Sequence, residues 1–394
     1  MRVPLLDLTR QHALVKGAVA ARVERLFESQ QFILGAAVEE FELAFRDFVG
    51  GGAAIGMSSG TDAQLAILMA LRVGPGDAVV TTPYTFFATA GCIHRTGAEP
   101  VFVDVETGTL NLDPSKLEEY LGTRCKADAD GCPVTPRGNR VRAVIPIHLF
   151  GACCRMDEIL AIARHHHLSV IEDAAQAAGA EYRGASGTAK AGAIAETSYF
   201  SFFPTKNLGG AGDGGMAVCR DEALATRLRL LRNHGMEQRY FHREVGGNFR
   251  LDALQAAVLH AKLPHLAGWN AARRRNASLY REAFASKGLG EFLTPPPPPS
   301  QGLENSHIYH QYVIRASNRD ALMAHLQAAG IGCAIYYPVP LHLQECFAYL
   351  GYQSGDFPVS ETASRESLAL PIFPELRPEE IEAVAEAVAG FYRK

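Results

Sequence analysis

The sequence has few of the features that mark specialised classes of protein. It contains no run of about 18 apolar residues, so no transmembrane helix is expected. Charge of neither sign dominates, since 38 Lys and Arg residues face 42 Asp and Glu residues, for a net charge of −4. This weak acidity predicts no nucleic-acid-binding surface and no attraction to anionic membranes. Residues 1–8 are too soon interrupted by charge to be a signal peptide, so a cytoplasmic protein is expected.

The eight cysteines form no framework. Cys125 and Cys132 share one polar loop and could form a disulfide or half of a metal site, but no second pair at zinc-site spacing accompanies them. Free thiols in a reducing compartment are the preferred interpretation. The histidine tract at residues 165–167 follows a helical pattern and is interpreted as a solvated helix end. No metal site is therefore expected.

Short apolar runs alternate with helical stretches through the first 250 residues. The runs predicted to be strands cover residues 54–57, 78–81, 100–105, 142–147, 169–173, 198–203 and 216–219. Helical periodicity occupies residues 62–72, 85–96, 114–121 and 156–167, and an amphipathic stretch at residues 11–48 precedes them with a break at 32–35. This alternation predicts an α/β fold whose seven-stranded, mostly parallel sheet lies between helices.

The pattern changes near residue 250. Two long helices are predicted at residues 251–267 and 270–287, followed by an exposed proline run at 295–299. Strands are predicted at residues 310–315 and 333–337, and helices at 319–329 and 378–392. We therefore expect a large domain over residues 1–250 and a smaller α+β domain over 251–394.

Residues 122–140 stand apart as an insertion. They are polar, rich in Gly, Pro, Asp and Arg, and separate a helix from a strand that short loops usually join. A plain surface loop is the preferred interpretation. A lid or an interface element is the alternative, because long ordered loops are often functional.

A lysine and an aspartate stand at the ends of two predicted strands. Lys206 follows the apolar run 198–203 and precedes a glycine-rich turn. Partial burial there lowers the pKa of an ammonium group, and a neutral amine can condense with an aldehyde. Asp173 ends the run 169–173, where open α/β sheets bind ligands, although a cap on a following helix is an alternative role. A lysine for an aldehyde and an acid for a ring nitrogen predict a pyridoxal 5′-phosphate enzyme.

Small polar residues and an aromatic residue complete the set. Gly60 and Thr61 lie between a predicted strand and a helix, where free N–H groups and close backbone approach suit a phosphate, although an ordinary N-cap has the same composition. Ser201 could supply a hydroxyl to the same phosphate. Phe86 could stack on a flat ring, whereas core packing is preferred for Phe87.

Taken in chain order, these features resemble the DegT/DnrJ/EryC1/StrS family of sugar aminotransferases, which bind pyridoxal 5′-phosphate and have the aspartate aminotransferase fold (fold type I). The resemblance covers nearly the whole length. It rests on the segments 3–8, 59–63, 172–176, 201–215, 232–235, 247–252 and 336–342. Two departures are Ala178, where many relatives have His, and the insertion at residues 122–140.

The resemblance implies a role for each matching residue. Lys206 would bind the cofactor aldehyde and move protons, and Asp173 would pair with the pyridine nitrogen. Phe86 would stack on the ring, and Gln176 would lie near its hydroxyl edge. The phosphate would be held by Gly60, Thr61 and Ser201.

Three further positions follow from the same resemblance. Asn248 would reach the cofactor phosphate of the neighbouring subunit, so the expected partner is a second copy in a homodimer with shared active sites. His342 and Tyr336 would line the sugar pocket.

The implied activity is a ping-pong transamination from L-glutamate to a nucleotide-linked keto sugar, in deoxyamino sugar or O-antigen biosynthesis. Residues 3–8 and 337–342 favour 3-keto sugars, and a 4-keto sugar aminotransferase is the alternative within the family. A dehydratase variant is disfavoured because histidine replaces the lysine there. A non-catalytic regulatory role is disfavoured because the sequence has no basic stripe and an intact cofactor constellation.

Overall fold

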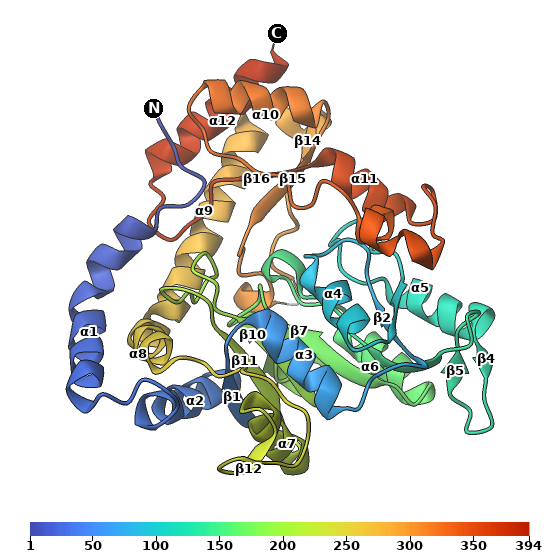
Figure 1. The fold of residues 1–394 in the computed structure, drawn as a ribbon. Helices are drawn as coiled ribbons and strands as arrows, with labels where there is room; N and C mark the ends of the chain where they lie inside the picture. Colours follow the sequence, from blue (N-terminus) through green and yellow to red (C-terminus); the bar gives the residue numbers. More distant parts are fainter. Residues whose placement is uncertain (301, 394) are drawn as a thin grey trace.

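A sheet of mostly parallel strands organises the N-terminal part of the chain (Figure 1). The computed structural model describes residues 1–300 and 302–393. In spatial order the strands are β1 (Ala53–Met57), β11 (Gly215–Cys219), β10 (Thr197–Ser201), β7 (Ser169–Asp173), β6 (Arg140–Val144), β2 (Asp77–Thr81) and β3 (Glu99–Phe102). Every pair from β10 to β3 is parallel, and β11 is antiparallel to both neighbours. The predicted α/β class and mostly parallel sheet are confirmed.

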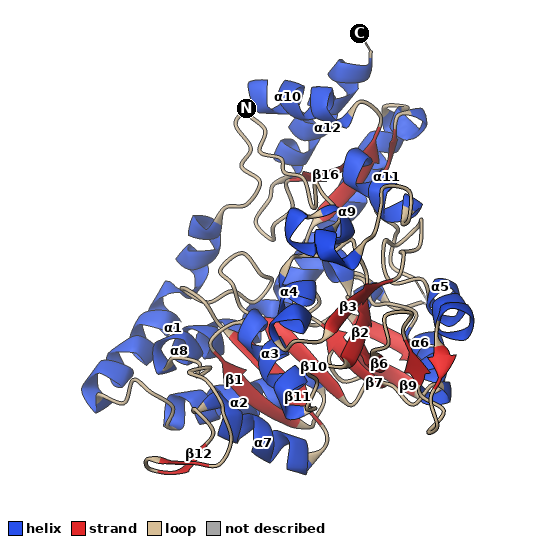
Figure 2. Ribbon diagram, turned by 45° about the vertical axis from the view of Figure 1, so that its right-hand side comes forward, coloured by secondary structure: helices blue, strands red, loops and turns tan. Residues whose placement is uncertain are grey.

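Helices cover both faces of this sheet (Figure 2). One face packs against α3 (Gly60–Ala70), α4 (Ala88–Arg95) and α7 (Glu222–Arg232), and the other against α2 (Ala36–Val49), α5 (Pro114–Glu119), α6 (Met156–His165) and α8 (Ala253–Lys262). Because side chains alternate along a strand, Phe200 faces α2 whereas its neighbour Tyr199 faces α3. Neighbouring residues of one strand therefore enter different environments.

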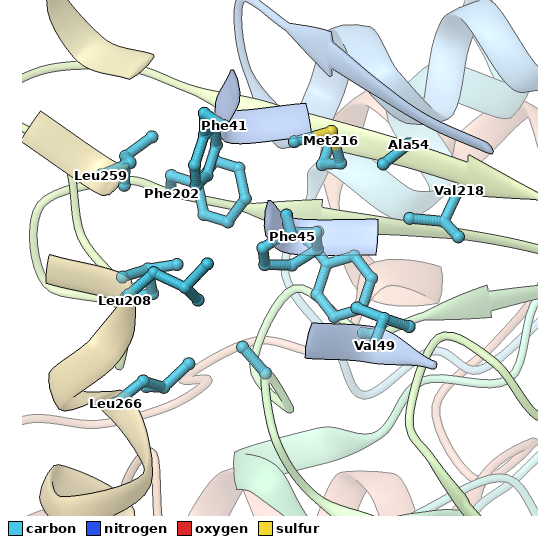
Figure 3. Packing of buried hydrophobic residues seen from close by; sticks show 14 of the residues in the cluster. Phe41, Phe45, Val49, Ala54, Phe202, Leu208, Met216, Val218, Leu259 and Leu266 are labelled. Atoms are coloured by element: carbon cyan, nitrogen blue, oxygen red, sulfur yellow. The ribbon is translucent and has the colours of Figure 1, made fainter. Parts of the chain in front are cut away.

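An aromatic cluster fixes α2 on the sheet (Figure 3). Phe41 and Phe45 lie on one side of α2, spaced four residues apart, and both are fully buried. Their rings lie 5.5 and 5.2 Å from the ring of Phe202, which follows β10. Truncating one such ring to alanine costs about 3–5 kcal/mol of stability. This packing anchors the backbone just before Lys206.

The C-terminal part forms a second core. It contains α9 (Leu266–Ser286), α10 (Arg319–Ala328), α12 (Pro378–Tyr392), and the antiparallel strands β14 (Leu293–Thr294), β15 (Tyr312–Ala316) and β16 (Ser367–Leu370). Trp269 on α9 packs into the core of the large sheet, whereas Ala277 on the same helix packs into the C-terminal core. We propose that the boundary between the two domains lies within α9, between these two residues.

Several element boundaries differ from expectation. The predicted break between residues 267 and 270 is wrong, because a 3-10 turn at Leu263–His265 separates α8 from α9 instead. The predicted strand at 333–337 is also wrong, since only Ala334 bridges to Ala369 there. The sequence did not reveal α11 (Pro358–Glu366) or β16.

The N-terminus belongs to both cores. Val3 pairs with Ile331 in the small domain, and α1 (Leu8–Ser29) then runs down to pack against α8. The side chain of Asp7 begins α1 by accepting the Thr9 N–H at 3.0 Å. Among the described residues, no helix is both long and apolar enough to cross a membrane.

The insertion at residues 122–140 is a short hairpin. Its strands β4 (Lys126–Ala127) and β5 (Pro133–Val134) pair with each other, and β5 meets β6 at Arg140. Arg140 is the first residue of β6, so the hairpin lies at the amino end of the sheet, at the right-hand edge in Figure 1. Both of its cysteines are free, as predicted.

Candidate active site

A cavity of about 730 Å³ opens at the carboxyl ends of the parallel strands. Both domains contribute to its walls. Eight of the ten residues predicted for the site line it: Gly60, Thr61, Phe86, Asp173, Gln176, Ser201, Lys206 and Tyr336. These residues come from five separate segments of the chain, so only the fold brings them together.

Lys206 lies in the tight turn after β10. The side chain is half-buried, and Nζ takes part in no hydrogen bond or ion pair within the described ranges. Burial lowers the pKa of Lys206 to about 8, while the charge of Asp173 opposes this shift. About a tenth of the amine is then neutral at pH 7, against about one part in three thousand for an ordinary lysine. The site therefore holds an unpartnered and partly neutral amine.

Asp173 ends β7 and is 6% exposed. One carboxylate oxygen accepts the Ala175 N–H at 3.0 Å, and the other accepts the Thr89 hydroxyl at 3.3 Å. Burial raises the pKa of Asp173, and nearby donors together with the charge of Lys206 oppose that rise. Residues 174–180 form turns rather than a helix, so the alternative role of Asp173 as a helix cap is not supported.

The first turn of α3 provides an anion cradle. Ser59 is the N-cap and accepts the Asp62 N–H at 3.0 Å, while Gly60 begins the helix. A Cβ at Gly60 would lie only 2.8 Å from the Cβ of Ser201, so only glycine permits this approach of helix and strand. Ser201 and the free N–H groups of the helix thus face one small volume, which suits a phosphate.

Gln176 is held in one orientation. Its Oε1 accepts the Phe150 N–H at 2.7 Å, and its Nε2 donates to the Tyr337 hydroxyl at 3.1 Å. The exposed ring of Phe86 lies 6.3 Å from the Tyr337 ring, at the edge of the cavity. A flat ligand between Phe86 and the sheet would place its edge near Gln176.

Two predicted residues do not line this cavity. His342 is buried against Phe357, and its Nε2 lies 3.2 Å from Glu361, so the structure does not place it against a ligand here. Asn248 lies in a neighbouring polar cavity of about 450 Å³, which it shares with Ser59 and Asp213.

Several cavity residues escaped the sequence interpretation. They are Gln64, Thr89, Tyr199, Asp213, His310, Gln311 and Tyr337. Asp213 and Tyr337 belong to motifs already noted in the sequence, and their roles could have been weighed there. The buried polar side chains of Gln64 and Tyr199 carry no local signal, because only the sheet and α3 bring them to the cavity.

The comparison with protein families decides the class. The model of the DegT/DnrJ/EryC1/StrS aminotransferase family matches residues 15–389. The chain belongs to this family. Family members are aminotransferases that depend on pyridoxal 5′-phosphate, so this DegT/DnrJ/EryC1/StrS protein is a pyridoxal-phosphate-dependent aminotransferase.

Curated relatives of this DegT/DnrJ/EryC1/StrS aminotransferase match over nearly the full length. A pleiotropic regulatory protein of Geobacillus stearothermophilus is 42% identical, covering 100% of this chain and 99% of the relative. The UDP-N-acetyl-3-dehydro-alpha-D-glucosamine 3-aminotransferase of Acidithiobacillus ferrooxidans is 39% identical, covering 98% and 97%. The dTDP-3-amino-3,4,6-trideoxy-alpha-D-glucose transaminase of Streptomyces venezuelae is 38% identical, covering 98% and 95%.

Solved structures agree with this assignment. DesV of S. venezuelae, in complex with a ketimine intermediate, superposes with a TM-score of 0.90 at 37% identity, covering 100% of this chain and 99% of that one. NtdA of Bacillus subtilis, with bound cofactor PMP, has a TM-score of 0.86 at 26% identity and covers 100% and 86%. Fold type I is thereby confirmed.

The residues present fit the cofactor of this family. The cavity offers an unpartnered amine at Lys206 and a buried acid at Asp173. It also has a glycine at position 60, where the Cβ of any other residue would close the anion cradle. An amine for an aldehyde, an acid for a ring nitrogen and N–H groups for a phosphate match the three polar ends of pyridoxal 5′-phosphate.

Proposed function

We propose that this aminotransferase moves an amino group from L-glutamate to a nucleotide-linked keto sugar, with carbon 3 as the acceptor. The observation that carries the reaction type is the unpartnered Lys206 amine, which shares the cavity with the buried Asp173. The carbon-3 assignment draws on the names of the two transaminase relatives, which act on a 3-dehydro and a 3-amino sugar. A 4-keto sugar is the competing substrate.

Each residue of the cavity has a distinct task in this proposal. When bound, pyridoxal 5′-phosphate supplies an aldehyde that bonds to amines and a ring that accepts the electron pair released at Cα. Lys206 Nζ accepts the Cα proton of the donor and returns a proton at the cofactor carbon. Its pKa of about 8 suits this exchange, because both protonation states are populated near neutral pH.

Asp173 and the phosphate cradle hold the cofactor in register. Asp173, as a carboxylate, keeps the proton on the ring nitrogen and thereby preserves the electron sink. The N-terminus of α3, with Gly60, Thr61 and Ser201, binds the phosphate, and Phe86 and Gln176 hold the face and edge of the ring.

The remainder of the cavity has room for a sugar. Beyond the polar groups assigned to the cofactor, the walls include Phe203, His310, Gln311 and Tyr336. Such a mixture of aromatic surface and a few amide or imidazole groups is typical of carbohydrate and nucleotide recognition. We place the keto sugar against this wall, with its carbonyl toward Lys206.

A homodimer completes the site in this proposal. Asn248 does not line the main cavity of its own chain, which is compatible with a role at a partner's phosphate. The nearby hairpin of β12 (Met236–Gln238) and β13 (Phe241–His242) and the loop after it expose apolar side chains, with Phe241 66% and Val245 88% exposed. Exposed apolar groups of this size commonly mark an interface.

Two experiments test the proposal. In the first, the protein is loaded with pyridoxal 5′-phosphate, and bleaching of its visible absorbance by L-glutamate is followed against D-glutamate as control. A protein that stays colourless with the cofactor would contradict the enzyme proposal and favour the regulatory class.

The second experiment assigns the sugar. Nucleotide-linked 3-keto and 4-keto sugars are incubated with the enzyme and 15N-labelled L-glutamate, and the position of the new amine is determined by NMR. Amination at carbon 3 supports the proposal, whereas amination confined to carbon 4 would replace it with the competing substrate.

A further inference from the structure

Asp173 has a neighbour that the mechanism has not used. Tyr199 on β10 lies in register with Asp173 on β7, in a parallel pair, so both side chains point to the α3 and α4 side of the sheet. Tyr199 is 3% exposed and lines the active-site cavity. Its ring therefore stands directly beside the acid that would face the cofactor ring.

The hydroxyl of Tyr199 is an unused donor. It is buried and has no hydrogen-bond partner of standard geometry in the described part of the chain. It lies close enough to Asp173 to lower the pKa of that carboxyl, and burial keeps its own pKa well above the usual range, so it stays protonated. Buried tyrosine hydroxyls usually have a hydrogen-bond partner, so the Tyr199 hydroxyl is available to donate to a neighbouring acceptor.

Asp173, in turn, has acceptor capacity to spare. Its bond to the Ala175 N–H is of ordinary length, but the bond from the Thr89 hydroxyl, at 3.3 Å, is long for an O–H donor. An ionised carboxylate offers about four acceptor positions. The Tyr199 hydroxyl is close enough to lower the pKa of Asp173 and is in register with it, so it can use one of these positions.

We propose that Tyr199 is a positioning residue that donates its hydroxyl to Asp173 and holds that carboxylate ionised and oriented toward the cofactor ring nitrogen. The proposal rests on the role assigned to Asp173 above. Tyr199 does not touch the reacting atoms and acts only through the carboxylate. Its loss is therefore expected to change how cofactor binding depends on pH.

Other charged or titratable groups also surround Asp173. They are Lys206 after β10, His148 after β6, Cys92 on α4 and Tyr337 in the small domain. All of them are retained when Tyr199 becomes phenylalanine, so a difference between the two proteins reports on the hydroxyl alone.

The test measures the dissociation constant of pyridoxal 5′-phosphate by equilibrium dialysis between pH 5 and 8. Without its donor, Asp173 is protonated at higher pH and cannot accept the ring N–H. The pH below which cofactor binding weakens is therefore expected to be about one unit higher in Tyr199→Phe than in the natural protein. At pH values below this point, the variant should bind the cofactor about tenfold more weakly. Coincident profiles for Tyr199→Phe and the natural protein would overturn the proposal.

Two further variants make the result specific. Tyr312→Phe is the matched control, because Tyr312 is also fully buried with an unpartnered hydroxyl but lies in the small-domain core, and its profile should follow the natural protein. In an Asp173→Asn background, Tyr199→Phe should add no further change at any pH; an equal effect there would overturn the proposal.

The same set separates this inference from the proposed function. If Asp173→Asn itself leaves cofactor binding unchanged, the role of Asp173 fails, and that of Tyr199 with it. If only Tyr199→Phe is without effect, the proposed function stands and the positioning role falls. Melting temperatures of the cofactor-free proteins report whether each variant is folded.

Discussion

Polar side chains at the two ends of the central sheet differ in how fully they are hydrogen-bonded. At the amino end, Glu99 accepts from Thr135 at 2.9 Å and from Asn139 at 2.7 Å, and it pairs with Arg137 at 3.2 Å. At the carboxyl end, neither the Lys206 amine nor the Tyr199 hydroxyl has a hydrogen-bond partner among residues 1–300 and 302–393. Glu99, which supports the fold, is satisfied within the chain, whereas Lys206 and Tyr199 at the cavity keep free capacity for a ligand.

The contrast is sharpest between two consecutive residues of β7. Glu172 is fully buried on one face and accepts the N–H groups of Gly192, Ile194 and Ala195 as well as a bond with His148. Asp173, on the other face, has one good bond and one long one. The strand thus presents, side by side, an acid that the chain itself satisfies and an acid with acceptor capacity to spare.

The largest expected effect comes from the unpartnered amine. Lys206→Ala is expected to lower transamination by more than about 10⁴-fold, because both the covalent group and the proton carrier are lost. Lys287→Ala is the control, since Lys287 is paired with Glu382 at 2.6 Å and Glu386 at 3.1 Å, away from the cavity. Initial rates with glutamate measure both, and a wild-type rate for Lys206→Ala would contradict the assignment.

Replacing each acid of β7 by its amide tests the contrast between Glu172 and Asp173. Asp173→Asn is expected to lower kcat by about 10²–10⁴-fold with little change in stability. Glu172→Gln should instead destabilise the fold by about 1–3 kcal/mol, because the amide nitrogen of glutamine cannot accept the N–H bonds that one carboxylate oxygen of Glu172 accepts. Urea unfolding and single-turnover rates separate the two outcomes, and equal stability losses would remove the distinction.

The pKa of Lys206 predicts a titration in the cofactor-free protein. Only the neutral amine reacts with aldehydes, so labelling of Lys206 by reductive methylation should rise with pH through a midpoint of about 8. Lys287, whose ion pairs raise its pKa, should be labelled only at higher pH. At pH 7.5 the difference in rate is expected to exceed about 100-fold, by mass spectrometry of each peptide. Equal midpoints would show that Lys206 is not desolvated.

The anion cradle gives a smaller effect. Gly60→Ala places a Cβ against Ser201 and is expected to weaken binding of pyridoxal 5′-phosphate by about 10–100-fold, at a stability cost of about 1–3 kcal/mol. Gly17→Ala in α1, where a new Cβ meets nothing within 4 Å, should leave binding unchanged and slightly stabilise the helix. Fluorescence titration checks both, and unchanged affinity in Gly60→Ala would place the phosphate elsewhere.

The smallest effect is expected at the amino end. Replacing residues 127–132 of the hairpin by a two-residue turn should alter kcat/KM by less than about twofold for any sugar, because the hairpin joins β6 at its first residue, opposite to the cavity. A change of sugar preference in this variant would bring the insertion into the substrate site and weaken the comparison between the two ends.

Much of the architecture followed from local pattern. Strands that are buried on both faces are continuous apolar runs, which is why the predicted run 216–219 lies within the fully buried β11. Secondary structure was harder to predict where polar and apolar residues mix. At residues 333–337, for example, a single β-bridge replaces the predicted strand. Strand ends were also imprecise: β3 stops at Phe102, although the apolar run continues to Val105.

In the candidate site, too, some residues could be predicted from local sequence and others could not. Lys206 and Asp173 could be proposed from sequence because each directly follows or ends an apolar strand, and parallel strands bring their carboxyl ends to one edge. His342 could not be placed, because its pairing with Glu361 depends on how α11 packs. Tyr199 was missed because nothing local distinguishes a core tyrosine from one beside a functional acid.

The sequence by itself determined the α/β class and the family, and it predicted the amine and the acid of the site, since these depend on local periodicity and on motifs at strand ends. Only the tertiary structure decided which polar groups are satisfied and which are left free. That distinction arises from contacts between distant segments, such as β7 with β10, whose register places the Tyr199 hydroxyl beside one acid of β7 and away from the other.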